Sequence, residues 1–98
     1  MIHLEKENFN ELITDKAIVD FYATWCGPCK MLSPVFESVS EEIKDTKFIK
    51  VDVDKFEELC RNYKVMSVPT LILFENGKEV KRKIGFIPKE QLIKFINE

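Results

Sequence analysis

The sequence is poor in cysteine, with three in 98 residues. Small secreted domains are stapled by paired cysteines, so an odd and sparse set favours a reducing compartment, most simply the cytoplasm. Glycine is equally scarce, with three residues, and the chain has no Gly-rich loop of the kind that cradles a nucleotide. We therefore expect no bound cofactor.

Neither sign of charge dominates, and long apolar runs are absent. Fifteen basic residues face seventeen acidic ones, for a net charge of −2. No apolar run approaches the roughly 18 residues needed to cross a bilayer. We expect neither a nucleic-acid nor a membrane partner. Residues 1–8 turn charged too early for a secretion signal and are too acidic for a transit peptide.

What the chain does have is an ordinary globular composition, 45% apolar and 33% charged. A chain of 98 residues can bury one core without disulfide staples. We expect a single domain over residues 1–98, and a monomer by default.

Alternating and helical apolar patterns predict nine elements in the order βαβαβα, then ββ, then α. Strands are expected at 2–4, 17–23, 47–53, 71–74 and 79–84, and helices at 9–13, 28–43, 54–63 and 88–96. Asn8 with Glu11, and Asp54 with Glu57, read as capping boxes. Helices between successive strands predict parallel pairing, whereas Asn76-Gly77 predicts a tight antiparallel hairpin. An α/β fold follows, with a mixed sheet between two helix layers.

The most informative stretch is Trp25-Cys26-Gly27-Pro28-Cys29, between a strand and a long helix. Two thiols at this spacing can close a small disulfide ring, and the start of a helix stabilises a thiolate on the first. Cys26 is therefore the expected nucleophile, exposed to solvent. Cys29, one turn inside, is expected to be less exposed and protonated until it is needed.

Zinc is the structural alternative for these thiols, with Cys60 and His3 completing the site. Structural zinc usually takes paired ligand motifs, and here there is only one pair, so we expect no metal. Cys60 lies on an apolar helix stripe, where it is either a small hydrophobe or a regulatory thiol. His3 reads as a solvated strand residue.

Asp20 is the one charged residue in the apolar strand 17–23. If it is buried, desolvation raises its pKa, and it lies well to take the Cys29 proton. If it turns to solvent, it has no such role. The strand pattern leaves both readings open.

Taken together, residues 20–30, Val65-Met-Ser-Val-Pro-Thr70, Asn76-Gly77 and Gly85 resemble the thioredoxin family over the whole chain. The resemblance implies the thioredoxin fold, a mixed five-stranded sheet flanked by four helices. It also implies a general protein disulfide reductase that is recycled by an NADPH-dependent thioredoxin reductase and acts on disulfide-containing proteins.

The resemblance assigns roles to further residues. Asp20 becomes the proton acceptor for Cys29, and Lys50 modulates that carboxylate, although Lys50 could be a plain surface lysine. Pro69 is expected to follow a cis peptide bond. An apolar rim for substrates is expected from Trp25, Gly27, Pro28, Val68, Pro69, Gly85 and Phe86. Trp25 could instead fill the core, and Phe86 is bulkier than the small residue expected after this glycine.

Two other functions fit the same fold. One is an oxidase or isomerase, but the ring carries no histidine, which favours a reducing couple. The other is a binding subunit that binds its partner through its surface and does not depend on thiol chemistry.

Overall fold

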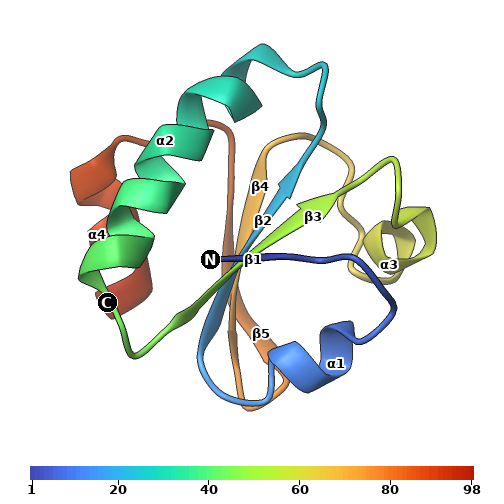
Figure 1. Ribbon diagram of the computed structural model, residues 1–98, viewed down its shortest axis with the longest axis horizontal. Coiled ribbons are helices and arrows are strands. Elements are labelled where there is room, and N and C mark those ends of the chain that lie inside the picture. Colours follow the sequence, from blue (N-terminus) through green and yellow to red (C-terminus); the bar gives the residue numbers. More distant parts are fainter.

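Five strands form one mixed sheet, and four helices cover it (Figure 1). The structure is a computed structural model that describes residues 1–98. Its elements are β1 (Ile2–His3), α1 (Phe9–Leu12), β2 (Ala17–Tyr22), α2 (Gly27–Glu42), β3 (Lys47–Asp52), α3 (Glu57–Asn62), β4 (Thr70–Glu75), β5 (Lys78–Ile84) and α4 (Lys89–Asn97). The predicted order and fold class are confirmed. No helix combines the length and hydrophobicity needed to span a bilayer.

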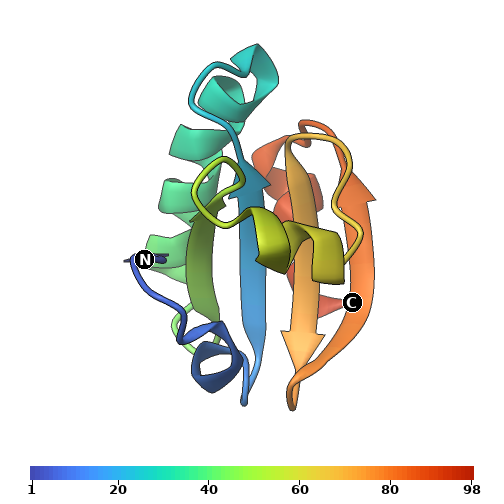
Figure 2. The ribbon, with the colours of Figure 1, turned by 90° about the vertical axis from the view of Figure 1, so that its right-hand side faces the viewer.

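The strands lie in the order β1-β3-β2-β4-β5, which makes β2 the centre of the sheet (Figure 2). β3 pairs in parallel with β1 and β2, whereas β4 pairs antiparallel with β2 and β5. The parallel pairing predicted for β1, β2 and β3 and the antiparallel β4–β5 hairpin are confirmed. The prediction is wrong for β4, which follows α3 but runs antiparallel to β2. In this register Asp20 of β2 lies opposite Lys50 of β3 on one side and Leu71 of β4 on the other.

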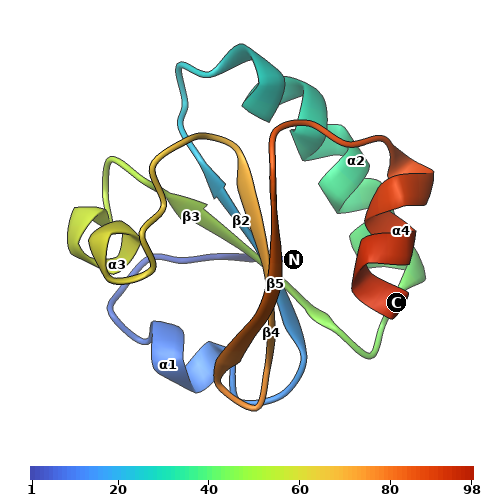
Figure 3. The same ribbon diagram turned by 180° about the vertical axis from the view of Figure 1, so that it is seen from behind.

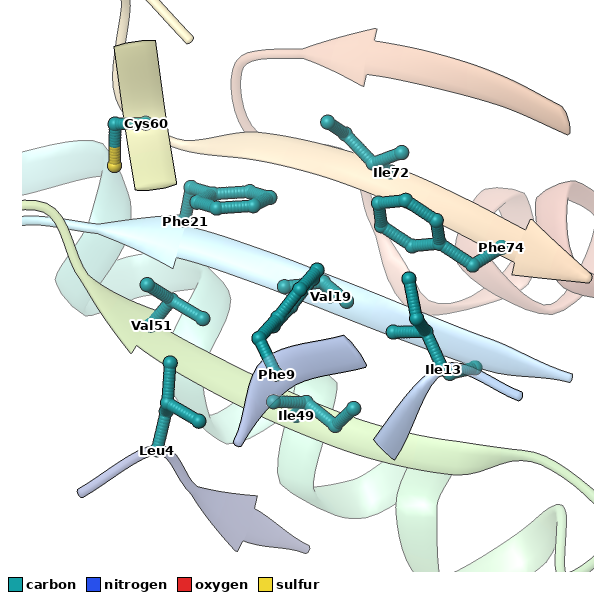
Figure 4. Close-up of a cluster of buried hydrophobic side chains, with 11 residues drawn as sticks. Leu4, Phe9, Ile13, Val19, Phe21, Ile49, Val51, Cys60, Ile72 and Phe74 are labelled. Carbon is teal, nitrogen blue, oxygen red and sulfur yellow. The ribbon is translucent and has the colours of Figure 1, made fainter. Parts of the chain in front are cut away.

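Side chains alternate between the two faces of the sheet along each strand, and each face carries a hydrophobic core. α1 and α3 cover one face, and α2 and α4 cover the other (Figures 1 and 3). The first face is filled by aromatic and β-branched side chains around Phe9, Phe21 and Phe74 (Figure 4). The second face contains other apolar side chains, among them Ile18, Leu32, Phe36 and Phe48. Asp20 and Lys50 alternate with the residues of the first face and so lie toward α2.

The β4–β5 hairpin has the predicted tight turn. Asn76 and Gly77 both adopt the left-handed conformation, with φ of 55° and 83°, as a type I′ turn requires. β5 is an edge strand, as its run of basic residues indicated. Arg82 of β5 also donates hydrogen bonds to the carbonyl oxygens of Tyr63 and Lys64, just beyond α3.

Both predicted capping boxes are wrong. Asn8 precedes α1, but its side chain makes no capping bond; its backbone oxygen accepts from Glu11 N at 3.1 Å instead. The N-cap of α3 is Phe56, which lies beyond the predicted cap Asp54. The Asp54 carboxylate is engaged elsewhere, because Trp25 Nε1 donates to it at 2.9 Å.

Candidate active site at the start of α2

Cys26 and Cys29 form a disulfide at the first turn of α2. From the C-terminal end of the central strand β2, a short loop leads into this helix (Figure 1). Cys26 is the N-cap residue, in an extended conformation, and the backbone N–H of Cys29 donates to Cys26 Sγ at 3.2 Å. Pro28 occupies the first turn, where its missing N–H leaves no bond unmade. A thiolate on Cys26 would face this N–H and the positive end of a 16-residue helix.

The predicted contrast in exposure between the two sulfurs is wrong for this disulfide form. Cys26 is 5% exposed and Cys29 is 3% exposed. Cys26 is covered because the loop before β4 lies against it: its Sγ is 3.6 Å from the Val68 carbonyl oxygen. Ala23 completes the small cluster around the disulfide, which is separate from the two main cores.

The loop that covers Cys26 contains the one cis peptide bond of the structure, between Val68 and Pro69. The resemblance implied this geometry. Gly85 reaches the same loop from the end of β5, where its N–H donates to the Pro69 carbonyl oxygen at 2.8 Å. Gly85 adopts a φ of 94°, which glycine tolerates best.

Trp25 is 69% exposed, so the core-filling alternative is wrong. With Val68 it lines a hollow of about 150 Å³ beside the disulfide, together with Val53, Val65, Met66 and Ser67. Met66 is 92% exposed and was missed by the sequence analysis. An apolar residue three positions before Pro69, between two predicted elements, was the available signal. Of the other rim residues, Gly27 and Pro28 are exposed, and Phe86 is 38% exposed.

Asp20 is fully buried, so the solvent-facing alternative is wrong. Neither of its carboxylate oxygens has a hydrogen-bond partner. Burial raises the pKa of this carboxyl from 3.8 to about 7, although Lys50 lowers it in part. An unpaired carboxyl with a pKa near neutrality can take up and release a proton under ordinary conditions.

Lys50 is only 7% exposed, which rules out a plain surface lysine. Its Nζ donates to Ser33 Oγ of α2 at 2.9 Å and lies 4.5 Å from the centroid of the Tyr22 ring. The sequence analysis missed both partners. Ser33 follows Cys29 by four residues, so a small polar residue on the buried stripe of α2 was the only signal.

Cys60 is buried among the side chains of Figure 4, and burial raises the pKa of its thiol to about 11. This environment suits a small hydrophobe rather than a reactive thiol. No group of three or more histidine, cysteine or acidic side chains is arranged to hold a metal. The zinc alternative therefore lacks its ligand set.

Comparison with known proteins decides the family, because the thioredoxin family model matches residues 1–98. The chain belongs to the thioredoxin family. It is 53% identical to the thioredoxin of Mycoplasmoides gallisepticum over 77 residues, which cover 79% of this chain and 77% of that protein. It is 45% identical to the thioredoxin of Chlamydia trachomatis over 96 residues, which cover 97% of this chain and 94% of that protein.

A solved thioredoxin structure agrees with the fold. A Plasmodium falciparum thioredoxin superposes with a TM-score of 0.92 at 33% identity, over 99% of this chain and 97% of that one. Membership of the thioredoxin family and the Cys26–Cys29 pair make this chain a protein-disulfide reductase that works by thiol–disulfide exchange.

Proposed function

We propose that this chain is a general protein-disulfide reductase whose nucleophile is Cys26 and whose resolving thiol is Cys29. The observation that carries the proposal is the disulfide at the N-terminus of α2, with the Cys29 N–H directed at Cys26 Sγ. The same donor and helix end stabilise a Cys26 thiolate both as it attacks and as it leaves.

The proposed cycle has two exchanges. The Cys26 thiolate attacks one sulfur of a substrate disulfide, and the other substrate sulfur leaves as a thiolate and takes a proton. Cys29 then loses its proton and attacks Cys26 Sγ, which releases the second substrate thiolate. The substrate gains two electrons, and the chain is left with the Cys26–Cys29 disulfide.

Asp20 is the proposed acceptor of the Cys29 proton, with Lys50 modulating its charge. A proton acceptor works best when its pKa lies near the working pH, because it can then both take up and release the proton. The pKa of Asp20, about 7, meets that requirement. In the disulfide form the Asp20 oxygens bond to nothing, so they are free to accept.

Trp25, Gly27, Pro28, Val68, Pro69, Gly85 and Phe86 are the proposed substrate-binding rim. The Val68 carbonyl lies beside Cys26, where an extended substrate strand would meet the backbone next to its disulfide. We propose that residues 1–98 act as one domain, as a monomer in the cytoplasm, with a thioredoxin reductase as electron donor. The single buried free cysteine fits a reducing compartment.

A coupled assay tests this function. With NADPH, a bacterial thioredoxin reductase and insulin as the disulfide substrate, the chain should support continuous NADPH oxidation. The C26S/C29S double variant should support none while keeping its fold. Oxidation of reduced proteins in preference to reduction of insulin would favour the oxidase reading. A double variant that retained the biological role of the chain would favour a binding subunit.

Phe86 offers a test of the rim. We expect Phe86→Ala to raise KM for bulky apolar protein disulfides about threefold to tenfold, because removing a half-exposed aromatic ring deletes contact area. The kcat should change less than twofold, since the sulfurs are untouched. The measurement is insulin reduction alongside reduction of a small activated disulfide such as 5,5′-dithiobis(2-nitrobenzoic acid), for which KM should not move. An equal effect on both substrates would contradict a binding role.

A further inference from the structure

Asp20 and Lys50 lie opposite each other on β2 and β3, yet they do not form an ion pair. Lys50 Nζ instead donates to Ser33 Oγ at 2.9 Å and lies 4.5 Å from the centroid of the Tyr22 ring. The two Asp20 oxygens are the only buried side-chain oxygens or nitrogens without a partner. The buried amino group of Lys50 thus has contacts from α2 and β2, while the buried carboxyl opposite it on β2 has no hydrogen-bond partner.

This arrangement runs against the simplest electrostatic expectation. An amino group and a carboxyl on adjacent buried strands attract strongly in a low-dielectric interior, and their pairing would satisfy both. A hydroxyl oxygen and the face of an aromatic ring are two kinds of neutral group that can satisfy an amino group instead. Ser33 supplies the first and Tyr22 supplies the second.

We propose that Ser33 and Tyr22 are positioning residues that hold Lys50 Nζ off the Asp20 carboxylate, and so keep Asp20 free to accept a proton during the dithiol reaction. The inference rests on the proton-acceptor role given to Asp20 above. It adds two residues whose effect on Asp20 passes through Lys50.

Few other groups can influence Asp20. On β4 its register neighbour is the apolar Leu71. On the same strand, burial raises the pKa of the Tyr22 phenol, and the carboxylates of Asp52 and Asp20 raise it further. At the start of α2, the thiols of the reduced form belong to the cluster against which Tyr22 packs. Lys50 is the one cation that lowers the pKa of Asp20, so its position decides the balance.

The decisive variant is Ser33→Ala. Lys50 then loses its oxygen acceptor, and the unpartnered Asp20 oxygens on the adjacent strand are available in its place. Closer approach of a positive charge lowers the pKa of a carboxyl, so the titration midpoint of Asp20 should fall from about 7 by about one pH unit. The measurement is the carboxyl carbon shift of Asp20, followed by ¹³C NMR in the reduced protein from pH 5 to pH 9.

Three companion variants separate positioning from packing. Ser33→Thr keeps a hydroxyl and should restore the wild-type midpoint. Ser40→Ala is the matched control, because Ser40 lies on the same helix and its hydroxyl donates only to the Glu37 carbonyl oxygen. Tyr22→Leu removes the ring face and should shift the midpoint downward by less than Ser33→Ala does.

Dependence on Lys50 is tested in a Lys50→Met background, where Ser33→Ala should produce no further shift. An unchanged or raised midpoint in Ser33→Ala would overturn the proposal, as would a full shift that persists without Lys50. The pH dependence of the resolving step tests the role of Asp20 separately. If the midpoint moves but that pH profile does not, the positioning of Lys50 stands and the proton-acceptor role of Asp20 fails.

Discussion

Replacing Cys29 with serine is expected to leave the chain joined to its substrate as a mixed disulfide through Cys26. Steady-state reduction of protein disulfides should fall by at least about a thousandfold. The reason is proximity: a tethered, oriented group acts at an effective molarity on the order of 10⁵ M or more, which no external thiol at millimolar concentration can match. The Cα atoms of Cys26 and Cys29 are 5.2 Å apart, within direct reach of each other's sulfurs.

The measurement is insulin reduction, combined with non-reducing electrophoresis to detect the trapped adduct. Cys60→Ala is the matched control, since that thiol is buried in the hydrophobic core shown in Figure 4. This substitution should leave the rate within about twofold of wild type. The Cys26→Ser variant should be inactive without forming any adduct. A Cys29→Ser variant that turned over at the wild-type rate, or that trapped substrate through Cys60, would refute the proposed order of attack.

The features that sequence reasoning predicted well depend on near neighbours in the chain. Strand and helix order follow from apolar spacing, and the Asn76-Gly77 turn follows from the φ values those two residues accept. The dithiol ring needs only Cys26 and Cys29 and a helix that starts between them. Local signals of this kind do not require knowledge of the tertiary structure.

The features that it missed join residues distant in the chain. Ser33 meets Lys50 across 17 positions, and Trp25 meets Asp54 across 29. The second contact gives the Asp54 carboxylate a partner other than the helix start predicted for it. The low exposure of Cys26 likewise comes from Val68, 42 positions away. Tertiary packing determines which of these residues meet, and the amphipathic pattern of each segment does not predict the pairing.

Asp20→Asn is expected to make the protein more stable and its chemistry slower. A carboxyl whose pKa rises from 3.8 to about 7 on folding is protonated more readily in the native state than in the unfolded one. Below pH 3.8 both states are protonated and no stability is lost. Between these pH values the unfolded chain ionises first, so stability declines as pH rises, and the loss is complete above about 7. The difference in pKa corresponds to about 4 kcal/mol.

Asparagine cannot ionise, so its variant should escape this loss. The free energy of unfolding of Asp20→Asn relative to wild type should therefore increase by about 4 kcal/mol between pH 4 and pH 8, as measured by urea unfolding of the oxidised form at both pH values. Asp15→Asn is the control, because Asp15 is exposed and its substitution should change stability by under about 0.5 kcal/mol at either pH. A pH-independent difference for Asp20→Asn would mean that the native carboxyl is not strongly perturbed.

The kinetic half of the same experiment tests the proposed role. Without the proton acceptor, the resolving attack by Cys29 should slow about 100-fold at pH 7, which is the low end of what general-base catalysis contributes. The deficit should shrink toward pH 9, because hydroxide then removes the Cys29 proton without help. Rapid-mixing kinetics of release from a preformed Cys26 mixed disulfide isolates this step. Rates equal to wild type from pH 6 to pH 9, in a variant that shows the predicted gain in stability, would make Asp20 a buried carboxyl without a part in the reaction.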